Sequence, residues 1–147
     1  MSERSEAGRR AAAFRRTREA HLTEVAEDYV ELIGDLIHLR GEARLADITE
    51  HMAVSQPTVS KIIARLRREG LVVSRPYRAI FLTEAGAQMA AEARRKHAIV
   101  ADFLRSLGLD EATVDADSEG IEHHVSDRTL QALIALTARL KAEAGTK

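Results

Sequence analysis

Apolar residues recur every three or four positions over the first half of the chain, which is the spacing of amphipathic helices. This pattern predicts helices over about 17–39, 43–53 and 55–69. Glycines follow two of these stretches, Gly41 after the first and Gly70 after the third, where a helix commonly ends. The first half is therefore expected to hold three consecutive helices.

The apolar pattern changes after Gly70 and then returns to a helical period. Segments 71–74 and 79–82 are short, rich in β-branched or aromatic residues, and separated by a connection with a proline, which predicts a hairpin. A long helix is expected over about 83–107 with Thr83 as its cap. Three further helices are expected: a short one from Glu111, one containing 118–124, and a last one starting near Ser126.

This order of elements predicts a mainly α-helical protein. Helix, turn, helix and hairpin in succession form a winged helix-turn-helix, here over 20–83. Residues 84–147 are then expected to form an all-helical domain for dimerisation and metal binding. Residues 1–19, which include five arginines in the first sixteen positions and lack a clear period, are expected to be a mobile N-terminal arm.

The composition excludes several kinds of cysteine chemistry and bears on where the protein is located. The chain has no cysteine, which excludes disulfides, iron–sulfur clusters and thiolate catalysis. No apolar run approaches the roughly 18 residues of a membrane span, and no signal peptide follows the N-terminal arginines, so a cytoplasmic protein without membrane contact is expected.

The net charge of −1 conceals two strongly charged regions. Residues 55–82 contain six Lys and Arg and one Glu, whereas residues 108–127 contain seven Asp and Glu and no Lys or Arg. Each region taken alone is typical of a solvated helix face. Because both coincide with predicted structured motifs, they favour one surface for a polyanion and another for cations.

The basic region carries the candidate DNA contacts. The start of the third helix enters the major groove in a helix-turn-helix, and the hairpin tip forms a wing that reaches flanking phosphates or the minor groove. The candidate residues are Ser55, Gln56, Pro57, Thr58, Ser60, Lys61, Arg65, Arg75, Tyr77 and Arg78. The alternative is an ordinary three-helix scaffold with a basic surface.

The acidic region carries candidate metal ligands. On a helix, Glu119, Glu122 and His123 stand at i, i+3 and i+4 and project from one face, whereas His124 points away from it. Asp28 and Glu31 form another i, i+3 acidic pair in the first helix, and His97 lies within an apolar stripe of the long helix. The candidate metal ligands are therefore Asp28, Glu31, His97, Glu119, Glu122 and His123. Taken singly, each has an ordinary alternative as a surface acid or a core histidine.

As a set, these residues suit a divalent metal. Four carboxylates and two imidazoles are ligands that Mn²⁺ and Fe²⁺ accept, and four negative charges balance two divalent ions. Spacing alone leaves open whether all six converge.

Four segments together resemble the DtxR/MntR family of metal-dependent repressors, closest to its manganese-responsive branch. They are Asp28-Tyr-Val-Glu31, Ser55-Gln-Pro-Thr-Val-Ser-Lys61, the isolated His97 and Glu119-Gly-Ile-Glu-His-His124. The resemblance implies that the six candidates are ligands to Mn²⁺, two ions per subunit, with Glu31 and Glu122 as bridges. It also implies a homodimer that binds a palindromic operator in double-stranded DNA and represses metal-uptake genes.

The resemblance leaves two regulatory alternatives and weakens an enzymatic one. Asp28 stands where iron-responsive relatives have Met, and its hard oxygen favours Mn²⁺, with Fe²⁺ as the alternative. A winged-helix regulator without metal is the second alternative. A di-metal carboxylate enzyme would use Glu-x-x-His motifs, which this chain lacks, so no enzymatic activity is expected.

Overall fold

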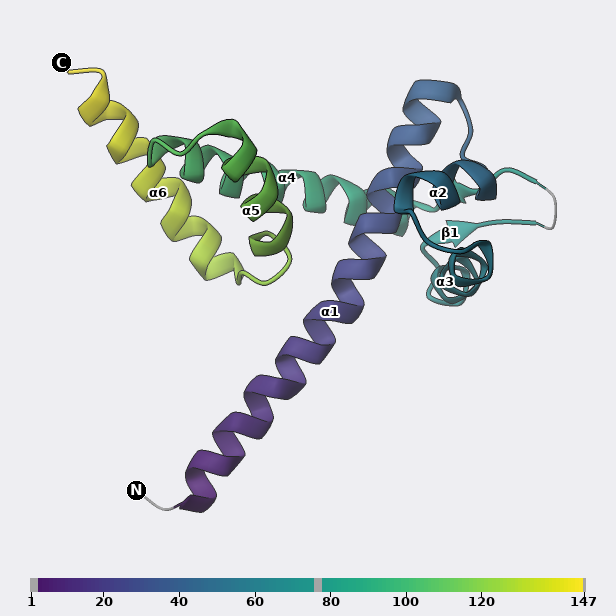
Figure 1. Cartoon of the computed structure of the whole chain (residues 1–147), viewed down its shortest axis with the longest axis horizontal. Coiled ribbons are helices and arrows are strands. Elements are labelled where there is room, and N and C mark those ends of the chain that lie inside the picture. Colours follow the sequence, from purple (N-terminus) through teal and green to yellow (C-terminus); the bar gives the residue numbers. More distant parts are fainter. Residues whose placement is uncertain (1–2, 76–77, 147) are drawn as a thin grey trace. The chain divides into compact units, whose positions relative to one another are not determined.

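The computed structural model describes residues 3–75 and 78–146 and is dominated by helices (Figure 1). The elements in chain order are α1 (Glu3–Arg40), α2 (Leu45–Met52), α3 (Gln56–Arg68), β1 (Val72–Val73), β2 (Phe81–Leu82), α4 (Glu84–Ser106), α5 (Glu111–Ile121) and α6 (Asp127–Ala144). This order confirms the predicted fold class. Among the described residues, no helix combines the length and apolar character that a membrane span requires.

The chain divides into two compact units. The winged-helix unit comprises Val25–Arg94, and the helical unit comprises the chain up to Glu24 together with the chain from Arg95. Helices α1 and α4 each contribute to both units.

In the winged-helix unit, α2 and α3 meet at a tight turn. The turn is made by Ala53, whose φ of 54° lies in the left-handed region, and Ser55 then caps α3 by accepting a bond from the Thr58 amide. Val59, Ile63 and Leu66, spaced by one helical turn, are the buried face of α3. The opposite face of α3 therefore remains available to solvent.

The hairpin packs behind this pair of helices. Val72 pairs with Leu82 in an antiparallel register, and Ala43 extends the ladder by an isolated bridge to Ile80. The predicted cap is confirmed, because the Thr83 hydroxyl accepts a bond from the amide of Gly86. A side chain at Gly86 would overlap the carbonyl oxygen of Leu71, the residue before β1, so α4 lies this close to Leu71 only because position 86 is glycine.

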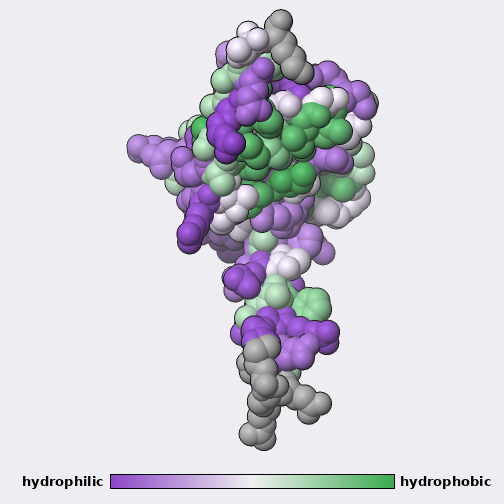
Figure 2. Space-filling view, turned by 90° about the vertical axis from the view of Figure 1, so that its left-hand side faces the viewer, coloured by the Kyte–Doolittle hydropathy of each residue, from purple (hydrophilic) through white to green (hydrophobic). Residues whose placement is uncertain are grey.

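In the helical unit, α4, α5 and α6 enclose a small apolar core of Val100, Ala101, Leu104, Val114 and Leu130. Side-chain caps start both α5 and α6: Asp110 accepts from the Thr113 amide for α5, and Ser126 accepts from the Thr129 amide for α6. Figure 2 shows apolar side chains gathered on one face of the protein. Two large apolar residues of α6, Ile134 and Leu136, are exposed.

Two predicted elements differ from the structure. Helix α1 begins at Glu3, well before the expected start near residue 17, so most of the expected arm is helical. The prediction of a separate helix over 118–124 is also wrong, because α5 runs unbroken to Ile121 and Glu122 is its C-cap. The many Ala and Arg residues of the N-terminal segment favour helix even without an apolar stripe.

Candidate metal centre and DNA-binding surface

A carboxylate occupies a core position at the end of α5. Val114, Ser118 and Glu122 follow one another at four-residue intervals, and all three are buried, Glu122 with a relative exposure of 2%. The apolar face of the helix thus ends in an ionisable group. A buried carboxylate is costly unless hydrogen bonds, a proton or a cation compensate it.

Each oxygen of the Glu122 carboxylate lies next to a different imidazole. The Nδ1 of His97, on α4, lies 2.5 Å from Oε2 of Glu122, and the Nε2 of His123 lies 3.3 Å from Oε1. The ligand atoms of Glu119, Glu122 and His123 all lie within 4.8 Å of one another. The structure therefore brings together the ligand atoms of Glu119, Glu122 and His123, which were predicted to share a face, and it places His97 next to Glu122.

Burial and neighbouring charges act on Glu122 in opposite directions. Burial, with a smaller contribution from the negative charge of Glu119, raises the pKa of Glu122 to about 7, against the opposing effects of His97 and His123. Near neutral pH, a proton therefore competes with any cation for this carboxylate. Two imidazoles and two carboxylates in one cluster are a donor set that fits a divalent metal of the Mn²⁺ or Fe²⁺ type.

The other two predicted ligands belong to the winged-helix unit. Asp28 and Glu31 lie one turn apart on α1, and both are partly buried. Arg94 braces this stretch of α1 from α4: its Nη2 donates to Asp35 at 2.7 Å and lies 3.5 Å from the Glu31 carbonyl oxygen. The six predicted ligands are thus divided between the units, four in one and two in the other, and their convergence stays a prediction.

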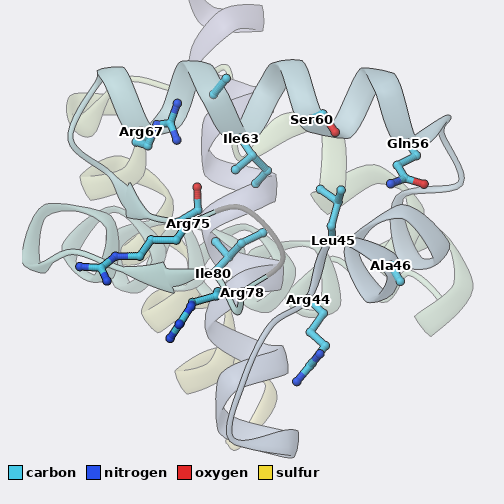
Figure 3. Close-up of a pocket in the computed structure, with 12 residues that line it drawn as sticks. Arg44, Leu45, Ala46, Gln56, Ser60, Ile63, Arg67, Arg75, Arg78 and Ile80 are labelled. Carbon is cyan, nitrogen blue, oxygen red and sulfur yellow. The ribbon is translucent and has the colours of Figure 1, made fainter.

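The winged-helix unit also carries a groove between α3 and the hairpin (Figure 3). Its volume is about 570 Å³. Apolar Leu45, Ile63 and Ile80 lie at its centre, while arginines lie around it. These arginines are Arg44, Arg67, Arg75 and Arg78. Among the described residues, no carboxylate pairs with Arg67, Arg75 or Arg78, so their charges are available to an anion.

The predicted DNA contacts are mostly exposed, as DNA contact requires. At the start of α3, the side chains of Ser55, Gln56, Pro57, Thr58, Ser60 and Lys61 are exposed, as are Arg75 and Arg78 beside the wing. The guanidinium of Arg65 donates to Glu69 at 2.7 Å, so part of its hydrogen-bonding capacity is already used. Tyr77 lies outside the described residues.

Some residues that line the groove or contact the histidines of the helical unit were not predicted from the sequence. Arg44 and Arg67 line the groove, although neither was among the predicted contacts. Helical spacing could have indicated Arg67, because it stands seven residues after Ser60 on the same face of α3. His21 and Glu24 were also missed, and both contact His124 in the helical unit.

Family models match both halves of the chain. Residues 21–80 match the N-terminal DNA-binding domain of iron-dependent repressors, and residues 83–143 match their metal-binding and dimerisation domain.

Individual relatives agree with these models. The chain is 48% identical over 126 residues to the transcriptional regulator MntR of Escherichia coli O6:H1, covering 86% of this chain and 81% of that protein. It is 37% identical over 100 residues to the HTH-type transcriptional regulator MntR of Listeria welshimeri, covering 68% of this chain and 70% of that protein.

Among solved structures, the manganese regulator SloR is similar, with a TM-score of 0.66 and 30% identity. The match covers 76% of this chain and 52% of SloR, so the chain spans about half the length of that solved protein. Two matched domains and a relative at 48% identity establish the family on independent grounds. The chain belongs to the DtxR/MntR family of metal-dependent transcriptional repressors.

Proposed function

We propose that this chain is a manganese-responsive repressor in which Asp28 and Glu31 share divalent ions with His97, Glu119, Glu122 and His123. Two ions per subunit would be balanced by the four carboxylates of this set, with Glu31 and Glu122 as bridging ligands. The observation that carries the proposal is the buried Glu122 carboxylate, whose two oxygens face two different imidazoles. A carboxylate with ligands on both sides is suited to bridge two cations.

The proposed ligand set explains how a cation controls DNA binding. Asp28 and Glu31 belong to the unit that carries α3, and the other four ligands belong to the helical unit. Sharing a cation would hold the two α3 helices of a homodimer near one turn of B-DNA apart, about 34–36 Å, to match a palindromic operator. Without the cation, like charges repel one another and DNA binding must also order the units. DNA and metal would therefore strengthen each other's binding.

A homodimer assembled through the helical unit fits the exposed apolar side chains of α6. Ile134 lines a groove with Ala98 and Ile99 of α4, and its side chain is 41% exposed in the single chain. Such apolar surface favours burial against a second copy. Action on DNA would place the protein in the cytoplasm.

Iron is the second candidate signal. The matched family models are those of iron-dependent repressors, and the same carboxylate and imidazole donors accept Fe²⁺. The hard oxygen of Asp28 favours Mn²⁺. Operator affinity measured at a series of buffered free Mn²⁺ and Fe²⁺ concentrations separates the two signals.

The functional test compares Asp117 of α5 with Glu122, the C-cap of the same helix. Glu122→Ala removes a proposed ligand, whereas Asp117→Ala removes an exposed carboxylate of α5 that has no proposed role. We expect Mn²⁺ to raise the operator affinity of the parent and of Asp117→Ala by at least about tenfold, a typical allosteric coupling, and to leave Glu122→Ala unchanged. Equal, metal-independent affinity in all three proteins would contradict the proposal.

A further inference from the structure

A second group of metal-ligating side chains lies in the helical unit. It consists of His21 and Glu24 on α1 and His124, which follows α5. Their ligand atoms lie within 4.8 Å of one another. None of the three belongs to the six proposed manganese ligands.

Both imidazoles are aimed at the same carboxylate oxygen. The Nδ1 of His21 lies 3.2 Å from Oε2 of Glu24, and the Nε2 of His124 lies 3.1 Å from that oxygen. The two rings stand edge to face, with centroids 5.2 Å apart and planes inclined by 72°. This arrangement brings two nitrogen donors and one oxygen donor to a common point.

The spacing of these atoms resembles that of ligands around one small cation. Metal–ligand bonds of about 2.1 Å at tetrahedral angles separate neighbouring ligand atoms by about 3.4 Å. The two nitrogen–oxygen distances are therefore already close to that separation, and small rotations of the side chains complete the set. The His21 side chain is 63% exposed, which leaves the outer side of the cluster open to water as a fourth ligand.

We propose that His21, Glu24 and His124 form a zinc-binding site whose three ligands are distinct from the six manganese candidates, although Glu24 also lies within 4.8 Å of His123. Two imidazoles, one carboxylate and one water are a ligand set typical of four-coordinate Zn²⁺. Affinity for nitrogen donors rises from Mn²⁺ to Cu²⁺ along the first-row metals and falls again at Zn²⁺, and Mn²⁺ stands lowest, so this site takes Zn²⁺ in preference to Mn²⁺. The six manganese candidates contain four carboxylates and only two imidazoles, and their preference lies further towards hard cations.

Zinc at this site would tie the N-terminal part of α1 to the segment after α5. His124 and Glu24 are 100 residues apart in the sequence, so the metal closes a long loop. A ligand that binds only the folded state stabilises it. Zinc therefore stabilises the helical unit.

Zinc counting on the full chain tests the site. The parent, His21→Ala, His124→Ala and His38→Ala are dialysed to equilibrium against buffered Zn²⁺, and protein-bound zinc is measured. His38 is an exposed histidine on the same helix α1 and outside the cluster, which makes it the matched control. We expect the parent and His38→Ala to hold one more zinc per subunit than His21→Ala and His124→Ala.

Two additional measurements keep the test decisive. If His124→Ala fails to fold, His124→Gln keeps a polar group of similar reach and lacks the imidazole. Zinc is expected to raise the thermal midpoint of the parent and of His38→Ala more than that of His21→Ala. Equal zinc content in all variants would show that the three side chains only hydrogen-bond to one another, and would overturn the proposal. Mn²⁺-dependent operator binding by His21→Ala reports separately on the manganese proposal.

Discussion

The two units bury very different kinds of side chain. The winged-helix unit contains a cluster of 14 buried apolar residues, whereas the corresponding cluster of the helical unit contains five. Conversely, four of the five buried polar residues among those described, Ser118, Glu122, His123 and Thr137, lie in the helical unit. Apolar burial is the main stabilising contribution in folding. The winged-helix unit therefore has the larger apolar core, whereas the helical unit gives core positions to polar groups, among them the Glu122 carboxylate.

The contrast explains how one small chain both reads DNA and senses metal. A winged-helix unit with a large apolar core provides a firm support for the arginines around its groove, which recognition of a ligand needs. A helical unit with a buried carboxylate changes its free energy whenever a proton or cation binds. The predictions that follow test each side of this comparison, from the largest expected effect to the smallest.

The largest effect is expected at Gly86, where α4 closely approaches the backbone of Leu71. Gly86→Ala places a methyl group against the Leu71 carbonyl oxygen, and the backbone of α4 or of the segment just before β1 must move. We expect a loss of about 3 kcal/mol in the free energy of unfolding, measured by urea denaturation. Gly8→Ala is the control, because nothing lies within 4 Å of a side chain at this helical position. A loss of equal size in both variants would contradict the close packing of α4 on Leu71.

A smaller effect of opposite sign is expected for Glu122→Gln without metal. The folded-state pKa of about 7 exceeds the ordinary value of 4.5, so the folded protein holds this proton more tightly than the unfolded chain. The associated stability is complete below pH 4.5 and is lost as the pH rises through about 7. In chelator at pH 8, we therefore expect Glu122→Gln to be more stable than the parent by about 1 to 2 kcal/mol.

The pH series supplies the control for that prediction. Near pH 4.5 the parent carries the neutral carboxyl, and thermal midpoints of the parent and Glu122→Gln are expected to converge. A difference that stays constant between pH 4.5 and 8 would show that the Glu122 charge is not the cause.

The smallest effect is expected at the groove of the winged-helix unit. Arg67→Ala removes an arginine that has no carboxylate partner among the described residues, and phosphate is the natural partner of such a side chain. We expect weaker binding to specific and unrelated DNA alike, with the slope of log affinity against log salt reduced by about 1. Arg139→Ala, which removes an exposed arginine from α6, is expected to leave that slope unchanged.

Sequence patterns predicted most of the fold because the local signals were strong. The apolar spacing of α3, its Ser55 cap and the Thr83 cap before α4 each depend on short-range geometry. The unbroken run of α5 was missed, because a short helix from Glu111 and another over 118–124 were expected where one helix reaches Ile121. The left-handed turn at Ala53 was also missed, since alanine rarely adopts that conformation and gives no signal for it.

The candidate sites were predictable only where residues close in sequence form them. Glu119, Glu122 and His123 were expected on one helix face; α5 ends at Ile121, but the turn that follows still brings their ligand atoms together. The contact between Glu24 and His124 could not be predicted, because it joins positions 100 residues apart. The packing of separate helices determines such contacts, and the periodicity within one helix does not encode them.

The central claim is that shared metal ligands fix the position of the winged-helix units in the dimer. The chain has no cysteine, so Arg68→Cys at the exposed end of α3 provides a single site for fluorescent labels. Distances between the two labels of a dimer are then measured by single-molecule energy transfer, with Mn²⁺ and with chelator. We predict that Mn²⁺ converts a broad distribution into a narrow one, and that the same measurement with Glu122→Ala stays broad. A distribution that is identical with and without Mn²⁺ in the otherwise unchanged protein would contradict the account.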